Sequence, residues 1–161
     1  MATTTTRQNW LCRAALIISL GKIIGCSGGS SGSNRHPAFF DLASLSATEA
    51  LEFMKSGQLT PTEYADALLE RAEKLEHLNA FIYFDPDQIR AAAEAATRKL
   101  NSGAPVGALV GLPLVVKDSI DTKGIPTTAG TPSLLHNIPT KNAAVLQALL
   151  DEGAYLFGKN N

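Results

Sequence analysis

The chain has 161 residues, of which 45% are hydrophobic and 18% are charged, and this balance is typical of a folded protein with an apolar core. The 14 Lys and Arg residues and 15 Asp and Glu residues give a formal net charge of -1, without the basic stripe that nucleic-acid binding needs. The 2 cysteines and 3 histidines have neither the spacing of a disulfide framework nor that of metal ligands. We therefore expect no metal, no cofactor and no nucleic-acid partner.

Residues 1–26 have the pattern of an export leader. Arginines precede an apolar stretch, residues 14–20, which is too short to span a bilayer. The segment Ile23-Ile24-Gly25-Cys26 resembles the lipobox of bacterial lipoproteins, although Lys22 places a charge in the hydrophobic region. The resemblance implies a lipid on Cys26 and an exported protein, either membrane-anchored or periplasmic. The alternative is an uncleaved leader and a cytoplasmic protein.

Residues 27–38 predict a linker between this leader and a folded part that covers residues 39–161. The run Ser27-Gly-Gly-Ser-Ser-Gly-Ser33 has the composition of a flexible tether, because small polar residues cannot form an apolar core. We assign this run no chemical role.

Two capping boxes predict helices at the start of the folded part. Ser46-Ala-Thr-Glu49 opens a helix that Gly57 can close, and Thr60-Pro-Thr-Glu63 opens a second, longer helix. Residues 80–84 are aromatic and β-branched, so they predict a strand. Asp85-Pro86 then begins an alanine-rich helix that runs to about residue 101.

The second half of the chain predicts a strand, a loop, a helix and a second strand. The apolar run Leu112 to Val116 indicates a fully buried strand that ends at Lys117. A helix over residues 141–152 leads into a strand over residues 154–157, and Lys159 at its end is expected to be ion-paired or exposed. Because this order is a βαβ unit, we expect two parallel neighbouring strands and an α/β fold.

Lys117 is the candidate for chemistry. A lysine desolvated by the core is disfavoured in its charged form, so it can act as a base near neutral pH. The alternative is a salt-bridged or solvated lysine. Asp118 can orient the following loop or accept hydrogen bonds from backbone N–H groups, and Thr127, Thr128 and Thr131 can bond to Lys117 or hold the loop near it. A purely structural role is the alternative for all four residues.

Two motifs together resemble the amidase signature family of serine amidohydrolases. They are G-L-P-L-V-V-K-D-S-I-D-T-K-G-I-P-T-T-A-G-T, residues 111–131, and D-E-G-A-Y-L-F-G-K-N-N, residues 151–161. Ser119 and Asn160 depart from the family's commoner residues but keep their polarity. The resemblance implies a mixed sheet between helices, of which residues 39–161 would be the truncated N-terminal part. It also implies a Ser-Ser-Lys triad in which Lys117 is the lysine and both serines lie beyond the last residue of this sequence.

The resemblance implies an enzyme that hydrolyses the carbon–nitrogen bond of a linear small-molecule amide. We expect the 161-residue chain on its own to be inactive, because a lysine without the two serines cannot form an acyl intermediate. One alternative is a subunit of a glutamyl-tRNA amidotransferase, which would be cytoplasmic. The other alternative is a non-catalytic truncated fragment. No oligomeric state is predicted.

Overall fold

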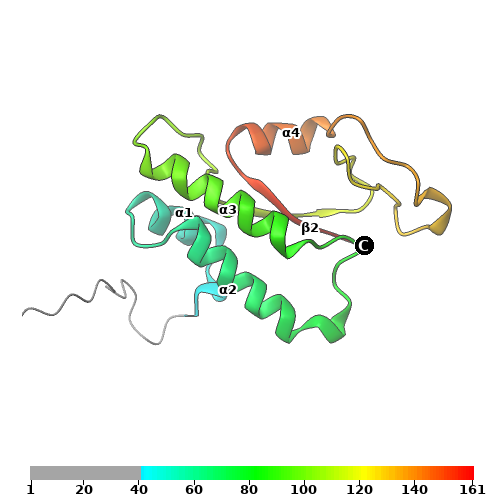
Figure 1. The fold of residues 1–161 in the computed structure, drawn as a ribbon, viewed down its shortest axis with the longest axis horizontal. Helices are drawn as coiled ribbons and strands as arrows, with labels where there is room; N and C mark the ends of the chain where they lie inside the picture. The colour runs from blue at the N-terminus through cyan, green and yellow to red at the C-terminus, as the bar shows by residue number, and fades with distance from the viewer. Residues whose placement is uncertain (1–40) are drawn as a thin grey trace, which may run out of the picture. The chain divides into compact units, whose positions relative to one another are not determined.

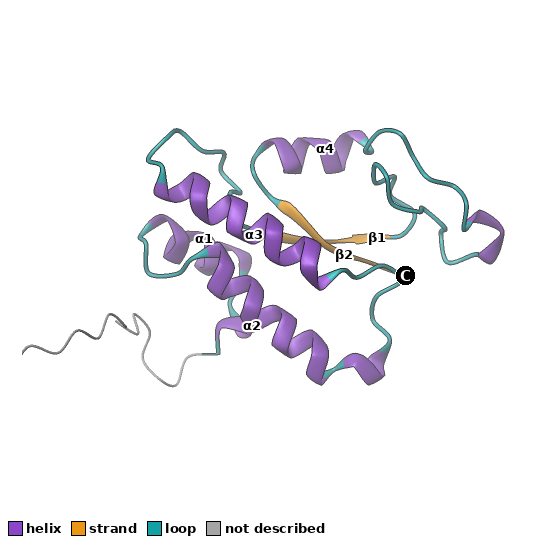
Figure 2. Cartoon of the chain, viewed as in Figure 1, coloured by secondary structure: helices purple, strands orange, loops and turns teal. Residues whose placement is uncertain are grey.

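The computed structural model describes residues 41–161, so the predicted leader, the linker and Cys26 lie outside the described residues. Figures 1 and 2 show the arrangement of the helices and the two strands. In chain order the elements are η1 (Leu42–Ser44), α1 (Ala47–Lys55), α2 (Pro61–Lys74), η2 (Glu76–Leu78), α3 (Pro86–Asn101), β1 (Pro113–Lys117), η3 (Pro132–Leu134), α4 (Ala144–Asp151) and β2 (Tyr155–Asn160), where η marks a short 3-10 helix. Across these residues, no helix combines the length and the apolar character that crossing a membrane would require.

Both predicted capping boxes are present. The Ser46 hydroxyl accepts the Glu49 N–H at 3.3 Å, and the Glu49 carboxylate accepts the Ser46 N–H at 2.9 Å. At α2, the Thr60 hydroxyl accepts the Glu63 N–H at 3.1 Å, and the Glu63 carboxylate accepts the Thr60 N–H at 2.8 Å. These reciprocal bonds satisfy N–H groups that the first turn of a helix leaves without partners. The predicted starts of both helices are therefore confirmed.

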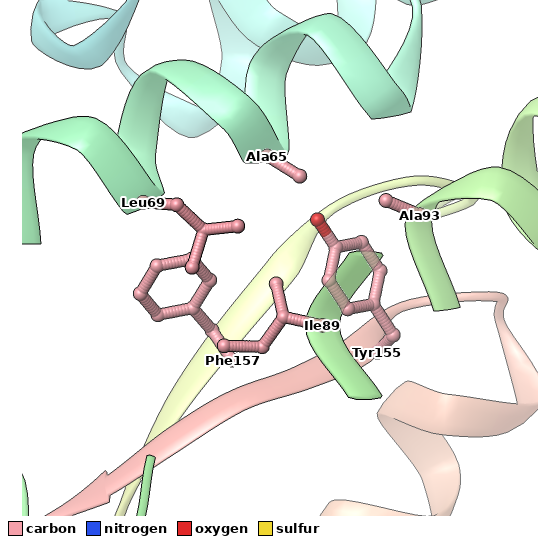
Figure 3. Close-up of a cluster of buried hydrophobic side chains, with 6 residues drawn as sticks. All are labelled: Ala65, Leu69, Ile89, Ala93, Tyr155 and Phe157. Carbon is pink, nitrogen blue, oxygen red and sulfur yellow. The ribbon is translucent and has the colours of Figure 1, made fainter. Parts of the chain in front are cut away.

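The main apolar core lies between α2, α3 and β2. Helix α2 packs on α3, and α3 packs on β2. Figure 3 shows the buried side chains that these three elements contribute, namely Ala65, Leu69, Ile89, Ala93, Tyr155 and Phe157. Small residues at the α2–α3 contact allow the helices to approach closely, while the two aromatic rings of β2 fill the space beneath them.

Strands β1 and β2 form a parallel two-stranded sheet, and α4 lies in the connection between them (Figure 2). Val116 pairs with Lys159 and Lys117 pairs with Asn160, after a register shift between Leu114 and Val115. The predicted βαβ unit and the α/β class are confirmed. Because the strands are parallel, their carboxyl ends meet at one edge of the sheet, and the polar residues that follow them are brought together there.

Residues 80–84 do not form the predicted strand. Tyr83 makes a single antiparallel bridge to Lys159, in which the Lys159 N–H donates to the Tyr83 carbonyl at 2.9 Å. The rings of Phe81 and Phe84 instead stack with their centroids 4.7 Å apart and pack on the core. The prediction was wrong because the aromatic side chains of this segment are buried by ring packing rather than by a strand ladder.

The strand before Lys117 is not fully buried as predicted. Val116 is 8% exposed, but Val115 is 48% exposed, because one face of β1 has no covering element within residues 41–161. Alternate side chains of a strand point to opposite faces, so only every second residue of β1 reaches the core. The burial of this strand was therefore overestimated from its composition.

The helix predicted over residues 141–152 begins three residues later, at Ala144. The preceding residues are held by the loop after β1. The Ala143 N–H donates to the Asp121 carbonyl at 2.8 Å, and the Asn142 side-chain oxygen accepts the Lys123 N–H at 2.7 Å. These contacts keep residues 142 and 143 out of the helix.

Candidate active site at the ends of the two strands

Lys117 is the last residue of β1, and its side chain is exposed between two buried neighbours. Val116 is 8% exposed and Asp118 is 1% exposed, whereas Lys117 falls on the opposite face. A turn begins directly at Lys117, whose carbonyl accepts the Ile120 N–H at 2.9 Å. Within residues 41–161 no hydrogen bond or ion pair involves the Lys117 ammonium. The desolvation by the core that was expected for Lys117 is therefore not found within residues 41–161, where its side chain is exposed at the end of the strand.

The Asp118 carboxylate points into the protein, where three groups contact one of its oxygens. Oδ2 accepts hydrogen bonds from the Thr128 N–H at 3.0 Å, from the Thr128 hydroxyl and from the Gly130 N–H at 3.5 Å. Burial by itself would raise the pKa of Asp118. The bonds from Thr128 and the charge of Lys159 outweigh burial and hold the pKa of Asp118 below its ordinary value. Asp118 is therefore a buried carboxylate kept in its ionised form.

Lys159 is the partner of this carboxylate, and its side chain is 0% exposed. Its Nζ lies 3.0 Å from Asp118 Oδ1, donates to the Pro126 carbonyl at 2.8 Å and donates to the Thr127 hydroxyl at 2.9 Å. The ammonium thus makes two hydrogen bonds and one ion pair, because the contact with Asp118 Oδ1 does not have hydrogen-bond geometry. Of the two predicted states of Lys159, ion-paired and exposed, the structure shows the first.

The loop after β1 supplies the remaining contacts. Thr127 and Thr128 are each 5% exposed, and their hydroxyls contact Lys159 and Asp118 respectively. Thr131 contacts the loop through its backbone, where its N–H donates to the Thr128 carbonyl at 2.9 Å. None of these three threonine hydroxyls is hydrogen-bonded to Lys117 in the part of the chain that the structure describes. The loop is held by the buried pair instead.

The backbone of this loop is tightly constrained around Gly130. Ala129 has a φ of 49°, and its N–H donates to the Asp118 carbonyl at 3.1 Å. Gly130 follows with a φ of 72°, a left-handed conformation that favours glycine. A Cβ atom at this position would also lie only 2.8 Å from Asn161 Oδ1. The conformation of residue 130 therefore favours glycine, whereas the close contact involves only the end of the Asn161 side chain, which can move aside.

Sequence reasoning placed no chemistry on Lys159, although two signals pointed to it. It stands near the end of a strand of aromatic and aliphatic residues, and its strand is the parallel neighbour of the one that ends at Lys117. The ends of parallel neighbours meet at one edge, so a cation on one and an anion on the other can pair. Two further candidates contribute little here: the Ser119 side chain is exposed, and the Asp121 side chain is exposed while its carbonyl bonds Ala143.

The arrangement combines an exposed amine at the end of β1 with a buried ion pair between Asp118 and Lys159. An amine in its neutral form can accept a proton from a hydroxyl that approaches it. No set of three His, Cys, Asp or Glu side chains within residues 41–161 is placed to hold a metal ion.

Comparison with known proteins gives a consistent result. The family model described as Amidase matches residues 63–161. A mitochondrial protein of Homo sapiens, which forms part of the glutamyl-tRNA(Gln) amidotransferase, is 40% identical over 116 residues, which are 72% of this chain and 22% of that protein. The chain thus spans about a fifth of the length of this curated relative.

Solved structures match the fold of the same part. A bacterial aryl acylamidase of the amidase signature family is 30% identical with a TM-score of 0.65, over 73% of this chain and 25% of the other. The native peptide amidase of Stenotrophomonas maltophilia is 31% identical with a TM-score of 0.64, over 77% of this chain and 25% of the other.

Proposed function

Because the chain belongs to the amidase signature family, we propose that the whole protein hydrolyses the carbon–nitrogen bond of a small-molecule linear amide, with Lys117 as the lysine of a Ser-Ser-Lys triad. Family membership supports amide hydrolysis in general. The observation that carries the role of Lys117 is its position, exposed at the end of β1 while Asp118 is buried and bonded. The proposed lipid on Cys26, outside the described residues, would place the protein at a membrane.

In the proposed reaction, the neutral Lys117 amine accepts a proton that a bridging serine passes on from a nucleophilic serine. The nucleophile then attacks the amide carbonyl, and the same proton goes to the leaving amine, which leaves an acyl-enzyme. A water molecule then attacks the acyl group while its proton returns to the nucleophilic serine, which releases the carboxylic acid and restores the enzyme. The chain described here contributes the proton acceptor and the backbone that holds it. Hydrolysis also needs the two serines and donors for the tetrahedral oxyanion, so we expect no turnover from residues 1–161 alone.

The test compares Lys117→Ala with Lys99→Ala in the whole protein. Lys99 is an exposed lysine in the last turn of α3, so its loss removes the same charge away from the site. Turnover of p-nitroacetanilide and of L-glutamine is measured with both variants. We expect Lys117→Ala to lower kcat by about 10³-fold or more, as the loss of a triad member does, and Lys99→Ala to have no effect. Near-normal turnover by Lys117→Ala would show that the role of Lys117 is misassigned.

A second candidate function is that of a component of a glutamyl-tRNA(Gln) amidotransferase. The observation that favours it is the 40% identity with the human mitochondrial protein of that name. Lys117 would have the same role in both candidates, so the fate of the amide nitrogen distinguishes them. Release of p-nitroaniline from p-nitroacetanilide supports the small-molecule amidase, whereas transfer of the amide nitrogen of L-glutamine to glutamyl-tRNA(Gln) supports the amidotransferase. The absence of both activities would favour a non-catalytic fragment.

A further inference from the structure

The buried pair of Lys159 and Asp118 is not explained by stability alone. Both side chains are removed from water, at 0% and 1% exposure, and the desolvation of two charges opposes folding. In other proteins, replacing such a pair by well-packed apolar residues is often neutral or stabilising. A lysine and an aspartate at these positions therefore call for a role that apolar residues could not fill, such as fixing one arrangement of hydrogen bonds.

Asp118, the residue directly after Lys117, is held through both its backbone and its side chain. The Asp118 N–H donates to the Asn160 carbonyl at 2.7 Å, and its carbonyl accepts the Ala129 N–H. Its carboxylate is bound by Lys159 and by Thr128. The backbone N–H, the carbonyl and the side chain of Asp118 are thus all held at once.

This anchoring determines where the Lys117 side chain can go. Neighbouring side chains on a strand point to opposite faces, so a buried Asp118 requires Lys117 to point to the exposed face. The turn that follows is closed by the Ile120 N–H on the Lys117 carbonyl at 2.9 Å, so the peptide on that side is held as well. Any shift of Asp118 would therefore redirect Lys117.

We infer that Lys159 is a positioning residue that acts through Asp118 to fix the direction of Lys117, and that Thr127 supports it by accepting one of its hydrogen bonds. This inference rests on the proposed function of Lys117. Proton transfer requires the reacting atoms to be held in a narrow geometry, and a displacement of about 1 Å can cost about 10²-fold in rate. Lys159 has no contact with the reacting atoms, so its loss affects the rate of the chemical step rather than substrate binding.

The first test is Lys159→Met in the whole protein, because methionine has a similar length and no charge. With p-nitroacetanilide and L-glutamine as probes, kcat per folded molecule should fall by about 10–100-fold. KM should stay within about twofold of its original value, because no binding contact is removed. The folded fraction is measured by near-ultraviolet circular dichroism, and Lys99→Ala is the control.

A gentler pair of variants keeps the ion pair and so remains informative if Lys159→Met does not fold. Thr127→Val removes the hydroxyl that accepts from Lys159 while keeping the shape, and Thr127→Ser keeps the hydroxyl. We expect Thr127→Val to lower kcat and Thr127→Ser to restore it. A purely structural role for Thr127 would predict equal kcat per folded molecule in both variants.

A readout independent of turnover is the methyl signal of reductively methylated Lys117, identified by its loss in Lys117→Ala. We expect one signal in the original protein and a shifted or multiple signal in Lys159→Met and Thr127→Val. If the signal and kcat are unchanged in both variants while Lys117→Ala is inactive, the positioning role is wrong. If Lys117→Ala itself keeps its activity, the proposed function is wrong, and the methyl signal still decides whether Lys159 directs Lys117.

Discussion

The Lys159 ammonium lies 3.0 Å from Asp118 Oδ1, and the two side chains, from neighbouring strand ends, are both almost fully buried. Asp118 follows the last residue of β1, while Lys159 is the second-last residue of β2. The loop through Pro126 and Thr127 closes over the ammonium and binds it. The pair therefore joins three separate segments of the chain beside the proposed catalytic lysine.

We predict that the ion pair makes the stability of the fold depend on pH in the acidic range. The pKa of Asp118 is held below its ordinary value of about 3.9 in the folded state, so below that pH the unfolded state binds more protons. The stabilisation is complete at pH values above the ordinary pKa of Asp118, and it is lost as pH falls through the lowered pKa of the folded state. Melting temperatures of the original protein and of Asp118→Asn, measured from about pH 6 to pH 2, should converge as pH falls.

At neutral pH, Asp118→Asn should destabilise the fold by about 3–5 kcal/mol, because it leaves the Lys159 charge buried without its partner. Asp87→Asn is the control, since the Asp87 side chain is 100% exposed. A difference between Asp118→Asn and the original protein that stays constant down to about pH 2 would contradict the lowered pKa.

We predict that Tyr155→Phe is neutral or stabilising at about pH 7. Tyr155 is 7% exposed, and its hydroxyl has no hydrogen-bond partner within residues 41–161. Figure 3 shows this hydroxyl pointing from β2 toward the helices of the core. An unsatisfied buried hydroxyl costs about 1–3 kcal/mol, so its removal should not lower the free energy of unfolding. A loss above about 1 kcal/mol in urea unfolding would indicate that the hydroxyl has a partner.

The same substitution should change the response to alkaline pH. Burial, and to a smaller extent the neighbouring Tyr64 and Asp66, raise the pKa of Tyr155 above its ordinary value. Above about pH 10 the unfolded state therefore binds fewer protons than the folded state, and stability falls as pH rises. Tyr155→Phe should lose less stability than the original protein between about pH 9 and pH 11, whereas Tyr83→Phe, as a control, should behave like the original.

Local signals in the sequence predicted the elements, because capping boxes and strand–helix–strand order depend on residues close together in the chain. Ser46 with Glu49 marked the start of α1 within a residue. The segment 80–84 was mispredicted because its intrinsic strand preference was overridden by aromatic packing on the core. Intrinsic strand propensity determines the conformation of such a segment only where tertiary packing has no stronger preference.

The site could be predicted only in part. Lys117 was recognisable from its motif, but the partner of Asp118 depends on which strands are neighbours and on how the following loop folds back. Lys159 is distant from Asp118 in the sequence, and the polar residues Asn160 and Asn161 that follow it are equally compatible with an exposed lysine. The hydrogen bonds of Thr127 and Thr128 likewise depend on the three-dimensional path of the loop.

We predict that Cys26, which lies outside the described residues, carries a lipid in the mature protein. The lipobox-like segment before it motivates this prediction, because that motif directs acylation of the cysteine in bacterial lipoproteins. Metabolic labelling with a radioactive fatty acid should mark the original protein and Cys12→Ser, but not Cys26→Ser. Label that persists in Cys26→Ser, or that is absent throughout, would contradict lipidation at this residue.

The last prediction concerns Gly158, where the segment 81–83 lies directly against β2. A Cβ atom at this position would lie 2.8 Å from Phe81 Cδ1 and 2.9 Å from the Tyr83 carbonyl oxygen, which is backbone and cannot move aside cheaply. Gly158→Ala should therefore destabilise the fold by about 1–3 kcal/mol through overpacking. The same shift of backbone would disturb the adjacent Lys159, so activity per folded molecule should fall as well.

The control for Gly158→Ala is Gly103→Ala, at a glycine with a φ of 69° and no atom within 4 Å of the added Cβ. Its cost is limited to about 1–2 kcal/mol of backbone strain, and it lies far from the site in the sequence. Thermal unfolding separates loss of stability from loss of turnover in both variants. If Gly158→Ala kept full turnover per folded molecule at any loss of stability, the packing of residues 81–83 against β2 would not be coupled to the position of Lys159.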